Sequence, residues 1–431
     1  MRSFARSHCF SRGQRIHLRR DALPEIQRLL RGMTMALVAG CFSAQAFSPS
    51  LARFPPLWSS PFAMLKRPVN RPNQTPTILK HRFISLPRTH LFSSDDILAR
   101  TSNDLRPSHL VEALLSWTPK IVRHGSTQQP VPVIFHPEYG FSDWDDKHRF
   151  VMAKFHGVMK QIEQLQLKPA LSQAFSVESD FAPISRAILE RVHDSHFVEA
   201  FCSGTLDNKA LRRIGLPWSP QLVRRTLLEC EGTRQTALHA LRTGLACNTG
   251  GGTHHAFASH GSGFTIFNDL AVTAQWLLDQ PTLGVKQVLV LDLDVHQGDG
   301  TAAIFADEDR VHTVSFHCES NFPFQKQRSD LDVGLADGVG DVEYLQELAR
   351  HLPSILALVQ PDLVLYDAGV DVHEDDVLGR LNLTDQGLFD RDYYVMRVCA
   401  ALGMHLFLVR CGKKRPVLSS SLFARHESTI E

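Results

Sequence analysis

The most apolar stretch of the chain runs directly into a group of carboxylates and an imidazole. In VLVLDLDVHQGDG, residues 288–300, an apolar run leads into Asp292, Asp294, His296 and Asp299. An isolated carboxylate is strongly disfavoured in a protein interior, so acids placed there are paired, protonated or bound to a metal ion. Residues 292, 294 and 296 alternate, so on an extended strand their side chains share one face. The spacing therefore predicts one concentrated polar site at the end of a buried strand.

Two further segments carry candidate partners for that site. TGGGTHHA, residues 249–256, places His254 and His255 after a glycine run, where the backbone can approach another group closely. YDAGVDVHEDD, residues 366–376, places Asp371 just past another apolar strand. An Asp-x-His pair on one strand and an Asp from a second strand give three ligands and an open position, as in catalytic zinc sites. Two carboxylates and a neutral imidazole leave zinc a strong Lewis acid toward a carbonyl group and water.

The elements that must position these groups are apolar strands alternating with segments of helical spacing. Helices are predicted over residues 343–359 and 391–403, and the chain shows neither an internal repeat nor a second folded domain. Continuous apolar strands of this kind indicate a parallel sheet covered on both faces, with ligands bound beyond the carboxyl ends of the strands. The predicted strands are VPVIFH (131–136), VLVLDLDV (288–295), VHTVSFH (311–317), DLVLYDAGVD (362–371) and LFLVRCG (406–412).

The first 95 residues differ in composition from the rest of the chain. Residues 1–94 hold fifteen Lys and Arg but only two acids, and the run MTMALVAGCFSAQA (33–46) is too short to span a bilayer. Acid-poor leaders rich in Arg and Ser are typical of organelle targeting segments. We therefore expect residues 1–95 to be a targeting leader for a plastid or a mitochondrion, and residues 96–431 to form one catalytic domain. The alternative is that this segment is a tail without a targeting signal and that the protein is nuclear or cytoplasmic.

Charge narrows the class of binding partner, and the cysteine pattern indicates the redox state of the thiols. Beyond residue 94 the chain has 31 basic and 43 acidic residues, which disfavours direct nucleic-acid binding and suits a cationic substrate better. The eight cysteines are scattered and form no CxxC pair, as expected of reduced thiols. We predict no membrane span.

At this point the sequence resembles the histone deacetylase family, including its acetylpolyamine amidohydrolases, over about residues 130–410. The segment NFPFQKQRSDLDV (321–333) is most similar to the class IV branch and its plant and bacterial relatives. The resemblance implies the arginase/deacetylase fold, a parallel eight-stranded sheet flanked by helices in a single domain. The matching motifs are HRFVMAKF (148–155), RVHDSHFVEA (191–200), GLPWSPQLVRR (215–225), GGGTHHA (250–256), GSGFTIFNDLAV (261–272), DLDVHQGDGTA (292–302) and DAGVDVHEDDVLGRL (367–381).

The resemblance also implies site residues and a reaction. Zinc-assisted hydrolysis of an acyl-lysine amide would release an acetyl or longer acyl group, and the family also holds a monovalent cation such as K⁺. By motif, the zinc ligands are Asp294, His296 and Asp371; the tandem acid/base pair is His254 and His255, oriented by Asp292 and Asp299; the substrate tunnel is Gly263, Phe264 and Phe322; and the monovalent cation site uses Asp292, Asp294 and main-chain oxygens around Ser315 and Phe316.

The sequence departs from the family after about residue 410. The family ends its last core strand with a glycine-rich turn and a tyrosine that stabilises the oxyanion, whereas here Gly412 is followed by Lys413, and no tyrosine follows Tyr394. Loss of one oxyanion donor costs about 10²–10³ in turnover. Three readings stay open: an altered C-terminus, Lys413 acting in place of the tyrosine, or a weakly active or inactive acyl-lysine-binding module.

The expected partner is therefore an acylated lysine in a histone or an organellar protein. An acetylated polyamine or another small amide is the alternative substrate.

Overall fold

The computed structural model describes residues 130–409, apart from residue 146 and residues 169–171. The expected leader (1–95), the residues up to 129 and the atypical C-terminus with Lys413 lie outside the described residues, so those expectations remain predictions. Of the helices in the described part, none combines the length and the apolar composition that a bilayer crossing requires.

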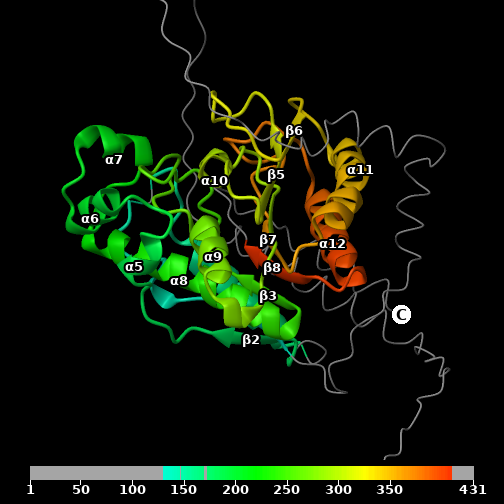
Figure 1. Cartoon of the computed structure of the whole chain (residues 1–431), viewed down its shortest axis with the longest axis horizontal. Coiled ribbons are helices and arrows are strands. Elements are labelled where there is room, and N and C mark those ends of the chain that lie inside the picture. The colour runs from blue at the N-terminus through cyan, green and yellow to red at the C-terminus, as the bar shows by residue number, and fades with distance from the viewer. Residues whose placement is uncertain (1–129, 146, 169–171, 410–431) are drawn as a thin grey trace, which may run out of the picture. The chain divides into compact units, whose positions relative to one another are not determined.

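An eight-stranded parallel sheet forms the centre of the described part (Figure 1), which confirms the predicted fold class. Its spatial order is β2-β1-β3-β8-β7-β4-β5-β6. The sequence patterns did not single out β2, β3 or β6. The strands are β1 (Val131–Ile134), β2 (Phe175–Glu178), β3 (Leu245–Asn248), β4 (Val288–Asp292), β5 (Val311–Cys318), β6 (Leu331–Leu335), β7 (Leu363–Asp367) and β8 (His405–Val409).

Helices cover both faces of this sheet. In Figure 1, α8 and α9 lie on one side of the strands, while α11 and α12 lie on the other. The elements between the strands are η1 (Pro137–Tyr139), α4 (Lys154–Gln166), α5 (Arg186–Leu189), α6 (Ser195–Ser203), α7 (Asn208–Ile214), α8 (Pro220–Thr243), α9 (Asp269–Leu278), η3 (Pro281–Leu283), α10 (Asp299–Ile304), α11 (Asp341–Val359) and α12 (Asp385–Ala401).

The helices on both faces of the sheet explain why β4 is apolar along its length. Leu289 and Leu291 pack in the larger core cluster with residues of α11 and α12, whereas Val288 and Val290 pack in a second cluster with α8 and α9. Successive side chains of a strand point to opposite faces, so a strand buried on both faces must be apolar at every position. The same alternation occurs in β7, whose residues divide between the two clusters in the same way. β7 pairs with β4 in the middle of the sheet.

The predicted strand over residues 288–295 is too long by three residues. β4 ends at Asp292, because the side chain of Asp292 accepts a hydrogen bond from the backbone N–H of Asp294 and turns the chain (3.0 Å). Asp294 and His296 therefore project from the loop after β4 and not from one strand face. The predicted helices also begin earlier than expected, since α12 starts at Asp385 behind an N-capping Thr384.

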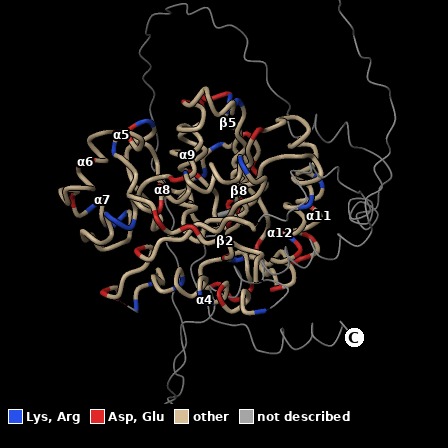
Figure 2. Tube along the Cα trace, turned by 90° about the horizontal axis from the view of Figure 1, so that it is seen from below, with Lys and Arg blue, Asp and Glu red and all other residues tan. Residues whose placement is uncertain are grey.

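Acidic and basic residues are interspersed over the described part (Figure 2). In that view, basic and acidic segments are scattered over the described part. The expectation that the protein does not bind nucleic acid directly stays a prediction.

Arg391 on α12 ties together the loops that follow β4 and β7. Its guanidinium is fully buried and donates to the carbonyl oxygens of Leu293 (3.1 Å) and Gly369 (2.7 Å), while its Nε donates to Asp392 (2.9 Å). Because Leu293 follows β4 and Gly369 follows β7, one side chain fixes the separation of the two chain segments that carry the candidate metal ligands.

We expect Arg391→Met to destabilise the protein by about 3–5 kcal/mol, because it leaves the buried Asp392 carboxylate without its cation. Arg397→Met is the matched control on the same helix, since Arg397 is partly exposed and should cost much less. Urea unfolding measures both changes. Equal losses for the two variants would contradict the role of Arg391.

Candidate metal centre and active site

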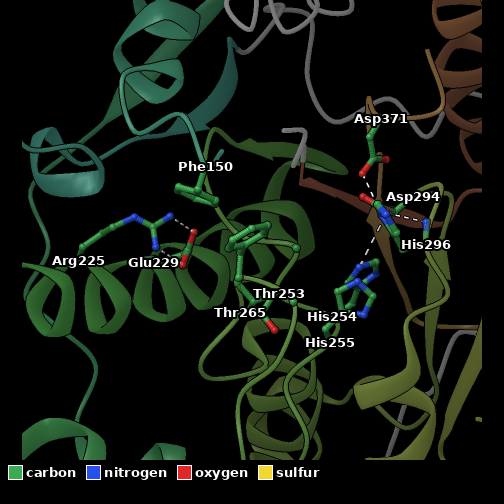
Figure 3. A pocket seen from close by; sticks show the side chains of 13 residues that line it. Phe150, Arg225, Glu229, Thr253, His254, His255, Thr265, Asp294, His296 and Asp371 are labelled. Atoms are coloured by element: carbon green, nitrogen blue, oxygen red, sulfur yellow. Dashed lines mark hydrogen bonds and ion pairs between the residues drawn. The ribbon is translucent and has the colours of Figure 1, made fainter. Parts of the chain in front are cut away.

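Three side chains from the loops after β4 and β7 converge at the carboxyl edge of the sheet. Nδ1 of His296 lies 2.9 Å from Oδ1 of Asp294 and 3.1 Å from Oδ2 of Asp371. All three side chains are buried, and their potential ligand atoms lie within 4.8 Å of one another. Figure 3 shows them pointing toward a common point, with His254 and His255 beside them. The structure thus brings together the three residues predicted to bind zinc.

The two loops can approach this closely because a glycine stands where they touch. A Cβ at Gly369 would lie 2.5 Å from the Cα of Asp294, which no side chain could tolerate. Asp371 is further held by the backbone, since its Oδ1 accepts a hydrogen bond from the N–H of Val295 (3.0 Å). The position of the Asp371 carboxylate is therefore set by the chain that carries the other two groups.

The tandem histidines each face one carboxylate. Nδ1 of His254 lies 2.6 Å from Oδ2 of Asp292, and Nδ1 of His255 lies 2.7 Å from Oδ1 of Asp299. A carboxylate at Nδ1 fixes the tautomer of an imidazole and leaves Nε2 to act on other groups. Nε2 of His254 is 3.8 Å from Asp294. These contacts match the orienting role predicted for both aspartates, and the role itself remains a proposal.

A buried network holds the glycine-rich loop that carries the histidines. Asp269, at the first position of α9, accepts hydrogen bonds from the backbone N–H groups of Gly252 (3.1 Å) and Thr253 (2.8 Å). Glu229 on α8 accepts a further one from Gly251 (3.1 Å). Gly252 has a φ of +73°, a conformation that residues with a side chain rarely adopt. The glycines therefore let the backbone of the loop approach these two buried carboxylates and donate hydrogen bonds to them.

Sequence reasoning missed Asp367, the last residue of β7. It is fully buried 3.8 Å from Nδ1 of His254, and neither of its carboxylate oxygens has a hydrogen-bond partner. With His254 and Asp292 it forms a second buried group of potential ligand atoms. Its position at the end of the same apolar strand that precedes Asp371 was the available signal.

The pocket leading to the centre is lined by residues from several loops (Figure 3). Gly263 and Phe264, both predicted tunnel residues, are among them, and Phe264 has the unusual φ of +66°. Phe322 is not part of this lining but packs edge-on against His255, with ring centroids 4.9 Å apart. The sequence did not single out the rest of the wall, which includes Phe150, Arg225, Glu229, Gly252, Thr253 and Thr265.

A non-glycine residue at positive φ is strained, and such strain is concentrated at functional sites. The ring of Phe264 lies 6.2 Å from that of Phe150 and 5.8 Å from that of His148. These contacts, together with the hydrogen bond from the N–H of Phe264 to Ile214 (2.8 Å), hold Phe264 in place. The fold thus maintains a backbone conformation that directs an aromatic side chain into the pocket wall.

Electrostatics at the centre favour positive charge. Burial alone would lower the pKa of His296, but hydrogen bonds to Asp294 and Asp371 raise it to about 9. Burial also lowers the pKa of His254, yet the charges of Asp292 and Asp294 hold it well above its usual value. Burial raises the pKa of Asp299 to about 6. The site therefore binds protons tightly, as expected of a cluster of acids built to receive a cation.

The residues fit a divalent cation. Asp294 lies near His254 and His296, and Asp371 lies near His296. The raised pKa values of both histidines mean that a metal ion would compete with protons at this centre. Two carboxylates and one imidazole suit zinc and other first-row divalent metals.

The predicted monovalent-cation residues also lie close together. Ser315 on β5 pairs in register with Asp292 on β4, and both Ser315 and Phe316 are buried. The hydroxyl of Ser315 is 2.9 Å from Nδ1 of His317. No observation here tests whether these residues bind a cation, so the monovalent-cation site stays a prediction.

A parallel eight-stranded sheet flanked by helices, with a buried Asp-His-Asp group beside two His–Asp pairs, is the arrangement expected of the arginase/deacetylase fold. Comparison with known proteins agrees, since a family model described as "Histone deacetylase domain" matches residues 148–412. The chain therefore belongs to the histone deacetylase family.

Three similar proteins illustrate the relationship. An uncharacterised protein of Picosynechococcus sp. is 51% identical over 272 residues, which cover 63% of this chain and 88% of that protein. Histone deacetylase 2 of Arabidopsis thaliana is 32% identical over 184 residues, which cover 42% of this chain and 47% of that protein. The crystal structure of an HDAC homologue from Aquifex aeolicus matches with a TM-score of 0.55 and 22% identity, covering 66% of this chain and 80% of the other. This structural match shows the fold alone.

We expect the protein to release about one proton for each divalent metal ion that it binds at neutral pH. The pKa of His296 is raised to about 9, so its imidazole is protonated below that pH and must lose the proton before it can bind a metal. Metal affinity should therefore rise by about tenfold per pH unit between pH 6 and 8. Calorimetric titration with Zn²⁺ in two buffers of different ionisation enthalpy measures the released protons. An affinity that does not change with pH would contradict this assignment.

Proposed function

We propose that the protein is a zinc-dependent amide hydrolase that removes acetyl or longer acyl groups from lysine side chains. The observation that carries the proposal is the convergence of Asp294, His296 and Asp371 beside the two His–Asp pairs. Asp294, His296 and Asp371 would hold the ion. Zinc bound there would supply Lewis acidity toward the acyl carbonyl and toward water.

The chain's own residues would carry the protons of this reaction. One histidine of the tandem pair takes a proton from the attacking water, and the other, in its protonated form, gives one to the departing lysine nitrogen. Asp292 and Asp299 keep Nδ1 of His254 and His255 protonated and stabilise the imidazolium form.

Gly263, Phe264 and Phe322 are proposed to guide the acyl-lysine chain. Gly263 and Phe264 line the pocket, and Phe322, which is outside that lining, packs against His255. Apolar walls suit the four methylenes of a lysine side chain, which are buried once the amide reaches the centre. We also propose that Asp292 and Asp294, with main-chain oxygens around Ser315 and Phe316, bind K⁺ close to the centre.

The missing family tyrosine leaves two narrower alternatives within the same proposal. If no group replaces the tyrosine, the oxyanion loses one donor, and the protein becomes a weak deacylase or an acyl-lysine-binding module. Lys413, the candidate replacement, lies outside the described residues. A deacetylase of polyamines or small amides remains the alternative for the substrate.

Metal content and turnover test the proposal together. We expect the purified protein to hold about one Zn²⁺ per chain and to hydrolyse an acetyl-lysine peptide, and both properties should be lost in Asp294→Ala and Asp371→Ala. The loss of affinity should exceed the roughly 10- to 100-fold typical of residues that only orient a ligand. Asp309→Ala, at an exposed aspartate after α10, is the matched control. Full metal content in Asp371→Ala would refute the proposed coordination, and metal binding without turnover would favour the binding module.

We further propose that residues 1–95 direct the protein to a plastid or mitochondrion. The acid-poor, Arg- and Ser-rich composition of this segment supports the proposal. A fusion of residues 1–95 to a fluorescent protein should be imported and shortened by cleavage. Accumulation of the intact fusion in the cytoplasm or nucleus would contradict organelle targeting.

A further inference from the structure

A groove lies at the amino edge of the sheet, at the opposite end of the strands from the candidate metal centre. It encloses about 640 Å³ and is formed where β4, β7 and β8 begin and where α8, α11 and α12 end. These strands are parallel, so their amino ends share one edge and their carboxyl ends the other. The groove is therefore separate from the site proposed for hydrolysis.

The wall of this groove is largely apolar and partly open to water. Leu283, before β4, and Leu402, after α12, are 36% and 39% accessible. The same wall contains Leu241, Val285, Leu356 and Met404. Apolar surface gathered in a concave site indicates an interaction surface, whereas single exposed apolar residues do not. The feature that needs an explanation is therefore what covers the groove.

The groove favours a positively charged occupant. Asp362 lies in its lining and accepts hydrogen bonds from the backbone N–H groups of Lys286 (2.7 Å) and Gln287 (3.0 Å). The last carbonyl groups of a helix carry partial negative charge, and three helices end at the groove. The nearby cations Arg242 and Lys286 are exposed and are not part of the lining.

The chain itself enters the described part at this edge. β1 begins at Val131, and only β3 separates β1 from β8 in the sheet. Neighbouring strands are about 4.8 Å apart, so β1 begins about 10 Å from the start of β8. Residues 125–130 could span roughly 20 Å when extended. A segment that ends at residue 124 can therefore reach the groove.

Residues 106–124, RPSHLVEALLSWTPKIVRH, lie outside the described residues, but their sequence suits this groove. The segment contains three Lys and Arg and one acid, Glu112, so its net charge is opposite in sign to that of the groove. Ser108 is a favourable helix N-cap, and Pro119 is a helix stop signal. Between them, the spacing i, i+1, i+4, i+5 of a helix with one apolar face is followed by Leu110, Val111, Leu114 and Leu115.

We propose that residues 106–124 dock into this groove as a helix and place Leu110, Leu114 and Leu115 against its apolar wall. The segment is tethered to β1, so its effective concentration at the groove is of millimolar order, which favours it over a second copy of the chain. The docking joins the segment that follows the expected leader to the edge of the sheet remote from the candidate active site. The inference does not depend on the proposed hydrolase activity.

Thiol labelling of the full chain tests the docking. Leu283→Cys places a thiol in the groove, and Val177→Cys places one on the edge strand β2, where Val177 is 38% accessible. Mass spectrometry measures the rate at which a maleimide reacts at each position. We expect the thiol at position 283 to react at least about tenfold more slowly than that at 177, as for a groove covered nine-tenths of the time. Leu402→Cys should be protected in the same way.

A charge on the apolar face of the segment should release it from the groove. Leu114→Arg would place a guanidinium against an apolar wall, so we expect the rate at position 283 to rise about tenfold, to that at 177. Ser116→Arg is the matched control, because residue 116 lies on the opposite face of the predicted helix. This variant adds the same side chain and should leave the groove protected.

Three results would overturn the docking. Equally fast labelling at positions 283 and 177 in chains without a charge substitution would show that the groove is open. Protection that persists in Leu114→Arg would mean that another molecule covers it, and protection that also weakens on dilution would identify a second copy. A rise at both positions in Leu114→Arg would mean that the whole fold loosens and not that a segment leaves the groove.

Discussion

The structure depends on the concentration of buried negative charge at the carboxyl edge of the sheet. Asp292, Asp294, Asp367 and Asp371 all lie at the ends of β4 and β7 or just beyond them, and each is almost completely shielded from water. Such a group is unstable without compensating positive charge. His254 lies within ion-pair distance of Asp292 and Asp367, and His296 lies within that distance of Asp294 and Asp371. The proposed chemistry relies on a divalent ion that competes with protons for this group of acids.

Keeping these acids together requires support from distant parts of the chain. Arg391 reaches from α12 to the carbonyl oxygens of both loops, and Gly369 lets the loops touch. Asp269 holds the loop that carries the tandem histidines. Each of these residues acts on the backbone of a loop that carries candidate site residues. They explain how mutually repelling side chains remain fixed within hydrogen-bonding distance of their partners.

Sequence patterns predicted the architecture and most of the centre because both have strong local signals. A strand buried on both faces must be apolar throughout, and that property made β4 and β7 recognisable. The three proposed ligands follow such strands directly. β2, β3 and β6 escaped notice because polar residues or glycine interrupt each of them, as in FSVE, LACN and LDVGL. None of the three is the continuous apolar run that made the other strands recognisable.

Other parts of the site depend on tertiary contacts that no spacing records. Arg225 and Glu229 form a buried pair within one helix, and only the folding of α8 against the glycine-rich loop makes Glu229 part of the site. The end of β4 at Asp292 is likewise set by a side chain turning back on its own backbone, which overrides the extended pattern of the sequence. Asp367 was overlooked because its importance comes from His254, more than one hundred residues earlier in the chain.

The two hydrogen bonds between Gln297 and Gln327 have a consequence for engineering this molecule. Both run from the side-chain amide of Gln297 to the backbone carbonyl and N–H of Gln327, and they join the loop that carries His296 to the segment between β5 and β6. A graft that replaced the segment around residue 327 would keep this connection with any residue other than proline at that position, because only the backbone takes part. Replacement of Gln297 by a residue without an amide would break both bonds at once.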